Sequence, residues 1–168
     1  MMSAGASAIK ELGLRRLLVA IDGSPSSDLA LAAAITVAQR DNAALTMITV
    51  EADLSSTPAG LGFITVPPPE IQQDAHRAAE KTLEDAIARL PDGMPATKIL
   101  RFGKAGPQIV AEAATGKYDA ILIGARRVGM VGALQGSVSQ YVLHHAKIAV
   151  FVTHAPPGDE SASREVST

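Results

Sequence analysis

The sequence predicts an α/β fold: a single doubly wound domain whose parallel sheet is covered by helices on both faces. Apolar segments of strand length alternate with helical segments from about residue 15 to residue 154, which is the order of βαβ units. The strand-like segments are apolar along their whole length, as in strands buried on both faces. Aromatic residues make up only 3% of the 168-residue chain, so the core must consist of Ala, Val, Leu and Ile, which suit close packing of helices on a sheet.

The first strand and helix are separated by a strong helix-start signal. Residues 15–22 (RRLLVAID) form a short apolar run that stops at a glycine and predict a buried strand. Ser24 is an N-cap candidate and Pro25 stands at the first helical position, so a helix is expected to follow over 26–41. Residues 44–52 (ALTMITVEA) predict the second strand.

The remaining elements continue the alternation after a long connection. Residues 53–70 are rich in Pro and Gly, and loops of more than about 12–15 residues are often functional or mobile. We then expect helices over 70–90, 106–115 and 137–146, and strands over 96–102, 117–124 and 147–154. In such a sheet, ligands bind beyond the carboxyl ends of the strands, where the winding direction reverses.

Composition and charge narrow the function classes. Cys is absent, which excludes disulfides and thiol chemistry, and the net charge of −2 gives no support to general nucleic-acid or anionic-membrane binding. No apolar run approaches the roughly 18 residues of a membrane span, and the N-terminus lacks a secretory core. We therefore expect a cytoplasmic protein with a domain over 14–154, a flexible leader over 1–13 and a disordered tail over 155–168.

A glycine-rich stretch follows the fourth predicted strand. Residues 124–140 read GARRVGMVGALQGSVSQ, and the spacing from Gly124 to Gly129 is that of a P-loop. Met130 and Val131 stand where that motif needs Lys and Ser or Thr, and the dinucleotide fingerprint G-x-G-x-x-G is missing as well. The stretch is therefore neither of these two phosphate motifs.

Physical chemistry still makes this stretch a candidate anion site. Gly136 precedes a predicted helix, and the first backbone N–H groups of a helix have no partner inside it. Ser137 and Ser139 add hydroxyl donors, and Arg126 and Arg127 add positive charge. A glycine before the helix would also let a phosphate oxygen approach the main chain.

Structural roles compete with binding roles at several of these residues. Ser137 with Gln140 matches a capping box, a role compatible with ligand binding. Asp22 either faces a ligand or accepts N–H bonds in the strand-to-helix turn. With Glu51 it forms the one carboxylate pair near the strand ends, where a divalent cation is conceivable only if the two converge beside phosphates, and no metal ligand is assigned. Ser24 is interpreted as an N-cap and not as a nucleophile, since no His–Asp arrangement surrounds it.

The four histidines do not predict a metal site. His144 and His145 are adjacent, so on a helix they point about 100° apart, and interaction with the helix C-terminus is the plainer role. His76 falls in the polar stripe of a surface helix and His154 ends the last strand. Neither has ligand spacing to a partner.

Two segments of the sequence carry a resemblance to a known family: AIDGS at 20–24 and the block 123–152, above all GSVSQYVLHHA at 136–146. The family that they resemble is the universal stress protein family. It implies a Rossmann-like five-stranded parallel sheet in the order 3-2-1-4-5 and a homodimer formed through the last strand, 147–154. One branch of the family binds ATP, or sometimes cyclic AMP, and the other branch does not bind nucleotide.

The nucleotide-binding branch carries a loop G-x2-G-x9-G-S/T after the fourth strand. Gly124 matches its first glycine, and Gly136 with Ser137 matches the last pair. Arg127 stands in place of the second glycine, and eight residues instead of nine separate it from Gly136. The loop of this chain therefore departs from the family pattern at its centre.

The resemblance implies a set of nucleotide-binding residues. Asp22 would meet the ribose or base, the main chain of Val50 would meet the adenine edge, and Gly124 would pass beneath the ribose. Ala20 stands where nucleotide-binding members often have Pro. The phosphates would meet the loop and the helix start, namely Arg126, Arg127, Gly136, Ser137, Val138 and Ser139.

Three functions are compatible with the sequence. The first is a stress-response protein that binds ATP or a related adenine nucleotide, with or without Mg²⁺, as a regulatory ligand. The second is a dimeric interaction module of the same fold that binds no nucleotide. The third, slow ATP hydrolysis, ranks last because the sequence shows no catalytic base and no phosphate-binding Lys.

Overall fold

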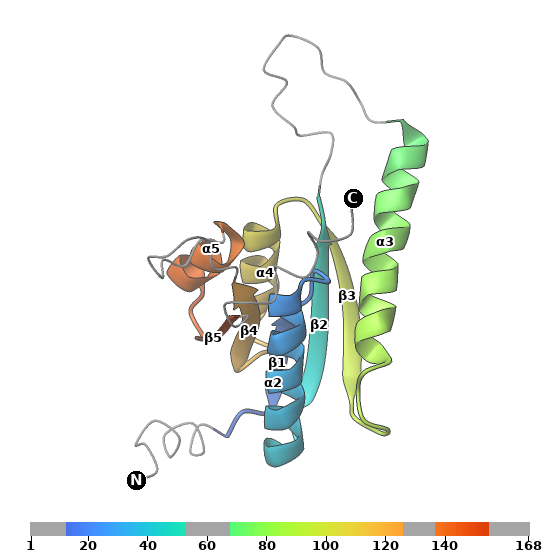
Figure 1. The fold of residues 1–168 in the computed structure, drawn as a ribbon. Coiled ribbons are helices and arrows are strands. Elements are labelled where there is room, and N and C mark those ends of the chain that lie inside the picture. Colours follow the sequence, from blue (N-terminus) through green and yellow to red (C-terminus); the bar gives the residue numbers. More distant parts are fainter. Residues whose placement is uncertain (1–12, 53–67, 126–136, 155–168) are drawn as a thin grey trace, which may run out of the picture.

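The computed structural model describes residues 13–52, 68–125 and 137–154 of the chain. These residues form one five-stranded sheet in the order β3-β2-β1-β4-β5, and all four neighbouring pairs are parallel (Figure 1). The elements are, in chain order, β1 (Arg16–Ala20), α2 (Pro25–Asp41), β2 (Ala44–Glu51), α3 (Pro69–Ile87), β3 (Ala96–Phe102), α4 (Ala105–Ala113), β4 (Ala120–Ala125), α5 (Ser137–His145) and β5 (Ala149–His154). The predicted fold class and strand order are confirmed.

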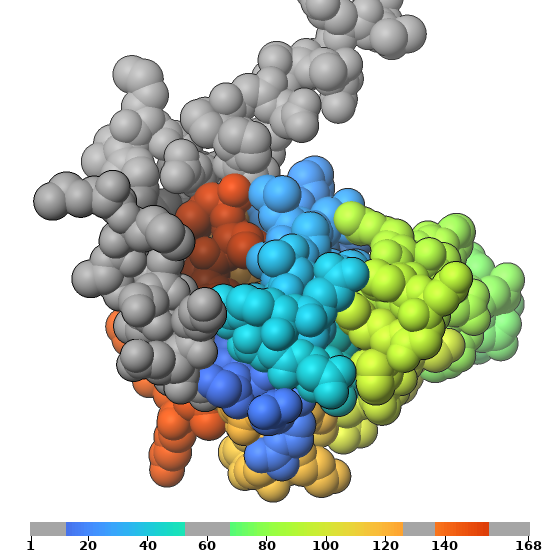
Figure 2. Space-filling view, turned by 90° about the horizontal axis from the view of Figure 1, so that it is seen from below, coloured from blue at the N-terminus to red at the C-terminus, as the bar shows by residue number. Residues whose placement is uncertain are grey.

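The strands separate two apolar layers. Leu17 and Val19 of β1 pack with α2 and α3 on one face, in a cluster that includes Leu31 and Leu83. Leu18, the residue between them, packs with α4 and α5 on the other face. Alternate side chains of a strand point to opposite faces, so a central strand that is apolar throughout supplies both layers. Figure 2 shows α2 and α3 next to one another on their shared face.

The start of α2 confirms the predicted signal. Ser24 is the N-cap, and its hydroxyl oxygen accepts a hydrogen bond from the backbone N–H of Ser27 at 3.2 Å. Pro25 occupies the first helical position, where a missing N–H is not needed. The helix ends at Asp41 and is capped by Asn42, whose backbone is left-handed (φ 55°) and whose N–H bonds to the Ala38 carbonyl.

Several predicted boundaries differ from those in the structure. The fourth strand begins at Ala120 instead of residue 117, and the fifth begins at Ala149 instead of residue 147. Before β4, the Asp119 carboxylate accepts hydrogen bonds from the backbone N–H groups of Arg15 and Arg16 at 2.9 and 2.8 Å. Before β4, hydrogen bonds from the backbone to the Asp119 side chain therefore replace the hydrogen bonds between strands. The apolar pattern of the sequence does not reveal where this change occurs.

The longest helix of the described ranges, α3, is amphipathic. It buries Ala79, Leu83 and Ala86 against the sheet, and it carries the exposed pair Lys81–Asp85 on its outer side. Within the described ranges, none of the helices has the length and apolarity needed to cross a bilayer.

Candidate functional site

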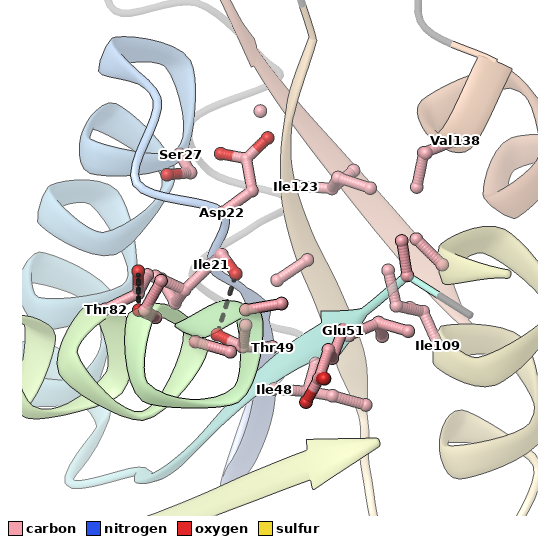
Figure 3. A pocket seen from close by; sticks show the side chains of 18 residues that line it. Ile21, Asp22, Ser27, Ile48, Thr49, Glu51, Thr82, Ile109, Ile123 and Val138 are labelled. Atoms are coloured by element: carbon pink, nitrogen blue, oxygen red, sulfur yellow. Dashed lines mark hydrogen bonds between the residues drawn. The ribbon is translucent and has the colours of Figure 1, made fainter. Parts of the chain in front are cut away.

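A cavity of about 310 Å³ lies where the carboxyl ends of β1, β2 and β4 meet (Figure 3). β1 pairs with β2 on one side and with β4 on the other, so this is the point where the winding direction of the sheet reverses. We call this space the strand-end cavity. Its described wall consists of Ala20, Ile21, Asp22, Ser27, Ile48, Thr49, Val50, Glu51, Ala52, Ala75, Ala78, Ala79, Thr82, Ala105, Ile109, Ile123, Gly124 and Val138.

The structure brings together half of the residues that the sequence singled out. Five of the ten line the strand-end cavity: Ala20, Asp22, Val50, Gly124 and Val138. Ser137 and Ser139 begin α5 but are not among the lining residues; Ser137 is exposed and Ser139 is only 1% exposed. Arg126, Arg127 and Gly136 lie outside the described residues. α5 begins at Ser137 itself, one position earlier than the predicted capping box requires.

Asp22 has the structural role that the sequence offered as one alternative. Its Oδ1 accepts a hydrogen bond from the backbone N–H of Ser24 at 2.9 Å, which shapes the turn between β1 and α2. The residue also lines the strand-end cavity. The turn therefore fixes a carboxylate at the cavity wall, and its contact with a ligand stays a prediction.

Gly124 is required by a close backbone approach. A β-carbon at this position would lie 2.5 Å from the Ser26 carbonyl oxygen and 2.6 Å from the Ser27 nitrogen. The same Ser26 oxygen accepts a hydrogen bond from the Thr153 hydroxyl of β5 at 3.0 Å. The end of β4 and the first turn of α2 are thus in direct contact, and this packing accounts for the glycine. A role beneath a ribose stays a prediction.

The polar side chains of the described cavity wall all present acceptors. The hydroxyls of Ser27, Thr49 and Thr82 donate to backbone carbonyls at 2.9, 2.8 and 2.9 Å, respectively. Their hydrogens are thereby engaged, and only lone pairs remain for a ligand. The two other polar members, Asp22 and Glu51, are carboxylates. This part of the wall suits a ligand surface that carries N–H or O–H groups.

Sequence reasoning missed the side of the cavity formed by α3. Three alanines spaced three and four residues apart, Ala75, Ala78 and Ala79, line it together with Thr82. Residues at this spacing share one face of a helix. Small residues that share one face of an otherwise charged helix are a sequence pattern from which this wall of the cavity could have been predicted.

Glu51 and His76 form a pair that the sequence did not suggest. Glu51 ends β2 with its side chain 5% exposed, and its Oε2 lies 3.0 Å from Nδ1 of His76. The Nε2 of the same ring lies 3.4 Å from Glu80, and the ring stacks on Phe102 at a centroid distance of 5.8 Å. The sequence placed His76 in the polar stripe of a surface helix but did not predict this partner, because the contact forms only where the end of β2 reaches that stripe.

This pair borders a second space, which we call the side hollow. Its volume is about 430 Å³. Its described wall consists of Glu51, Ala52, Pro69, Gln72, Gln73, His76, Arg77 and Phe102. Glu51 and Ala52 line both spaces and so form the boundary between them.

The proposed carboxylate pair for a cation does not extend to a larger ligand set. Asp22 and Glu51 both line the strand-end cavity. Within the described ranges, however, no three His, Cys, Asp or Glu side chains are grouped so that they could hold a metal ion.

At the end of α5, Nδ1 of His145 lies 2.8 Å from the Tyr141 carbonyl oxygen, and the two rings stack.

A polar cluster around the buried side chain of Glu112 supports α4. Glu112 of α4 accepts hydrogen bonds from Arg101 at 2.6 Å and from the Tyr118 hydroxyl at 2.8 Å. Burial alone would raise the pKa of Glu112, but the bonds from Arg101 and Tyr118 outweigh it, so the pKa lies below the ordinary value. Burial, together with the bond to Glu112, raises the pKa of Tyr118. The cluster fixes α4, which carries Ala105 and Ile109 of the cavity wall.

Comparison with known proteins identifies relatives of this sequence. A sequence model of the universal stress protein family matches residues 13–154. Universal stress protein YxiE of Bacillus subtilis is 32% identical over 133 residues, which are 76% of this chain and 90% of that protein. Universal stress protein Rv2005c of Mycobacterium tuberculosis is 33% identical over 138 residues, 81% of this chain. The chain spans only 44% of the length of that mycobacterial relative.

Solved structures share the fold. A universal stress protein family member from Arabidopsis thaliana with AMP bound superimposes with a TM-score of 0.62 at 17% identity, over 89% of this chain and 97% of that one. The universal stress protein from Archaeoglobus fulgidus in complex with dAMP gives a TM-score of 0.61 at 19% identity, over 83% and 97%. These structures show the shared fold, and the family model over residues 13–154 with the similarity to YxiE shows the family: the chain belongs to the universal stress protein family.

Proposed function

We propose that the protein binds an adenine nucleotide, ATP above all, in the strand-end cavity as a regulatory ligand of the stress response. One observation carries the proposal. Ala20, Asp22, Val50, Gly124 and Val138 come from four separate segments of the sequence, and all five line one cavity at the switch point of the sheet. That two relatives of the same fold hold AMP and dAMP supports it further.

The size of the cavity suits the nucleoside part of such a ligand. Ligand pockets commonly measure roughly 300–1,000 Å³, and the strand-end cavity, at about 310 Å³, lies at the lower end. In our proposal the base lies against the main chain of Val50 and the ribose lies near Asp22. The phosphates then point toward the start of α5, where Val138 lines the cavity and backbone N–H groups favour an anion.

Binding measurements test the proposal. Calorimetry and thermal unfolding would be run with AMP, ADP, ATP and cyclic AMP, each with and without Mg²⁺. A ligand present at a hundredfold excess over its Kd should raise the free energy of unfolding by about 2.7 kcal/mol. Asp22→Ala should weaken binding. Asp85→Ala, which removes an exposed carboxylate that is not part of the cavity wall, should leave binding unchanged.

A dimeric interaction module that binds no nucleotide is the second candidate. It is favoured by β5, which lies at one edge of the sheet and whose largely apolar residues are half-buried or exposed. An apolar strand at a sheet edge is a liability that pairing with a second chain removes. The absence of heat and of any unfolding shift with all four nucleotides would favour this candidate over the first.

A further inference from the structure

The carboxylate of Glu51 is buried at the boundary of the strand-end cavity. Its side chain is 5% exposed, and its ion pair within the described residues is made by Oε2 with Nδ1 of His76 at 3.0 Å. A carboxylate offers about four lone-pair sites on two oxygens, so this bond leaves accepting capacity. Burying a charged group is unfavourable unless hydrogen bonds compensate, and further donors at this position are therefore stabilising.

The main chain next to Glu51 is where we place the base of the nucleotide. Val50 directly precedes Glu51 at the end of β2, and both residues line the strand-end cavity. Figure 3 labels Glu51 among the lining side chains. The exocyclic amine of adenine carries two hydrogens. One of them can bond to the main chain of Val50, and the other is then available for a neighbouring acceptor.

The other polar side chains of the described wall limit which residue can recognise the base. The hydroxyls of Thr49 and Thr82 already donate to backbone carbonyls, so no described side chain of the wall is a free donor to a base. Glu51 differs from these hydroxyls because it carries charge. A hydrogen bond to a charged group contributes more than one between neutral groups. The other carboxylate of the wall, Asp22, lies near the ribose in our proposal, so Glu51 is the charged acceptor placed to distinguish bases.

We infer that Glu51 is a specificity-determining residue that accepts a hydrogen bond from the exocyclic amine of the base, so that the cavity selects amino purines. The inference rests on the proposed function, because it assumes that a nucleotide occupies the strand-end cavity. His76 acts on Glu51 as a positioning residue: its imidazole holds one carboxylate oxygen and leaves the other for the ligand.

Two nucleotides that differ only by the amine test the inference. The Kd values of AMP and of purine riboside 5′-monophosphate, which lacks the amine, would be measured by calorimetry on the full chain. Loss of a hydrogen bond to a buried charged acceptor should weaken binding about tenfold to a hundredfold. Equal Kd values on the wild-type protein would overturn the inference while leaving nucleotide binding intact. If neither compound binds, the proposed function itself fails.

The variant Glu51→Gln tests whether this side chain causes the difference between the two Kd values. The amide oxygen would accept the bond from His76, so the NH₂ group would face the ligand and present a donor in place of an acceptor. The ratio of the two Kd values should fall to within about threefold of unity. A ratio that stays at the wild-type value in Glu51→Gln would show that another group reads the amine.

The matched control is Glu80→Gln. Glu80 contacts the other nitrogen of His76 at 3.4 Å, and its side chain is 56% exposed. It is not among the described residues of either cavity wall. The substitution removes the same charge from the same histidine, and the Kd ratio should stay at the wild-type value. A purely structural effect of the charge change would alter both variants alike.

Discussion

The backbone nitrogen of Ser27 lies so close to Gly124 that a β-carbon on the glycine would be 2.6 Å away. β-Carbons in real structures essentially never approach another heavy atom so closely. The obstacle is backbone at the start of a helix, which cannot rotate aside as a side chain can. β4 and α2 therefore meet at a contact that only glycine permits.

Gly124→Ala should destabilise the fold. The added methyl group forces the first turn of α2 away from β4, and overpacking of this kind costs about 1–3 kcal/mol or somewhat more. Urea unfolding followed by circular dichroism measures the change. Gly106→Ala, whose β-carbon would meet Cβ, Cγ and Cδ1 of Tyr141 at 2.9 Å, is expected to cost less, because the overlap is smaller than at Gly124. An unchanged midpoint for Gly124→Ala would contradict the contact.

Ser24→Ala should remove the N-cap of α2. The N–H of Ser27 loses its side-chain acceptor, and the loss of such a cap lowers the free energy of unfolding by about 1 kcal/mol. Thermal or urea unfolding measures the difference. Ser24→Asp keeps an acceptor at the same position and should retain most of the stability. Equal losses in both variants would show that the cap does not stabilise the helix.

Ala78→Phe should block ligand binding without unfolding the protein. Ala78 lines the strand-end cavity from α3 and is itself exposed, so the ring can enter the cavity without displacing core side chains. We expect AMP affinity to fall at least tenfold in calorimetry, with the unfolding midpoint nearly unchanged. Ala88→Phe adds the same ring at an exposed position just beyond α3 that is not part of the described wall, and should bind as the wild type does. Normal binding by Ala78→Phe would rule out this cavity.

The Glu112 cluster should make stability depend on acid pH. The folded-state pKa of Glu112 lies below the ordinary value of about 4.3, so its contribution is complete above that value and is lost as the pH falls through the folded-state pKa. Glu112→Gln should lower the free energy of unfolding at pH 7 by about 1–3 kcal/mol, since the bonds from Arg101 and Tyr118 lose a charged acceptor.

Urea titrations of the wild type and of Glu112→Gln between pH 3 and pH 7 check the sign. The difference between the two proteins should narrow as the pH falls below the ordinary pKa of a glutamate and through the lowered folded-state pKa of Glu112, because the wild-type carboxyl then takes up a proton. A difference that stays constant across this range would mean that the charge of Glu112 contributes nothing.

Light scattering tests the dimer that the last strand suggests. Because β5 leaves one edge of the sheet open to pairing, we expect a mass twice that of one chain. Ala149→Lys places a charge at the exposed start of this edge strand and should shift the mass toward that of the monomer. A monomeric wild type at micromolar concentration would contradict the proposed pairing.

Short sequence patterns predicted the helices and strands well where the residues concerned have a single structural role. Ser24 and Pro25 located the start of α2, and the apolar runs located all five strands. Boundaries failed where a side chain competes with sheet pairing, as Asp119 does before β4. The resemblance to a known family supplied the strand order, which periodicity alone does not determine.

The cavity was predictable only in part, because it depends on contacts between distant segments. Asp22 lies two residues after β1 and Gly124 is the last but one residue of β4, and both were found from their places near strand ends in the sequence. The pairing of Glu51 with His76 joins residues 25 positions apart, and it forms only once α3 lies across the end of β2. Gly124 was predicted at the right place for a different reason, since the close approach of Ser27 is invisible in the sequence.

The alanine-lined side of the cavity has an evolutionary consequence. Ala75 and Ala78 lie on the surface of a helix and do not pack in the core. A mutation at either position therefore changes the volume available to a ligand without disturbing the fold. Descendants of one ancestral gene can in this way drift toward bulkier or slimmer molecules by single steps along α3. Divergence of binding preference is thereby separated from the risk of misfolding.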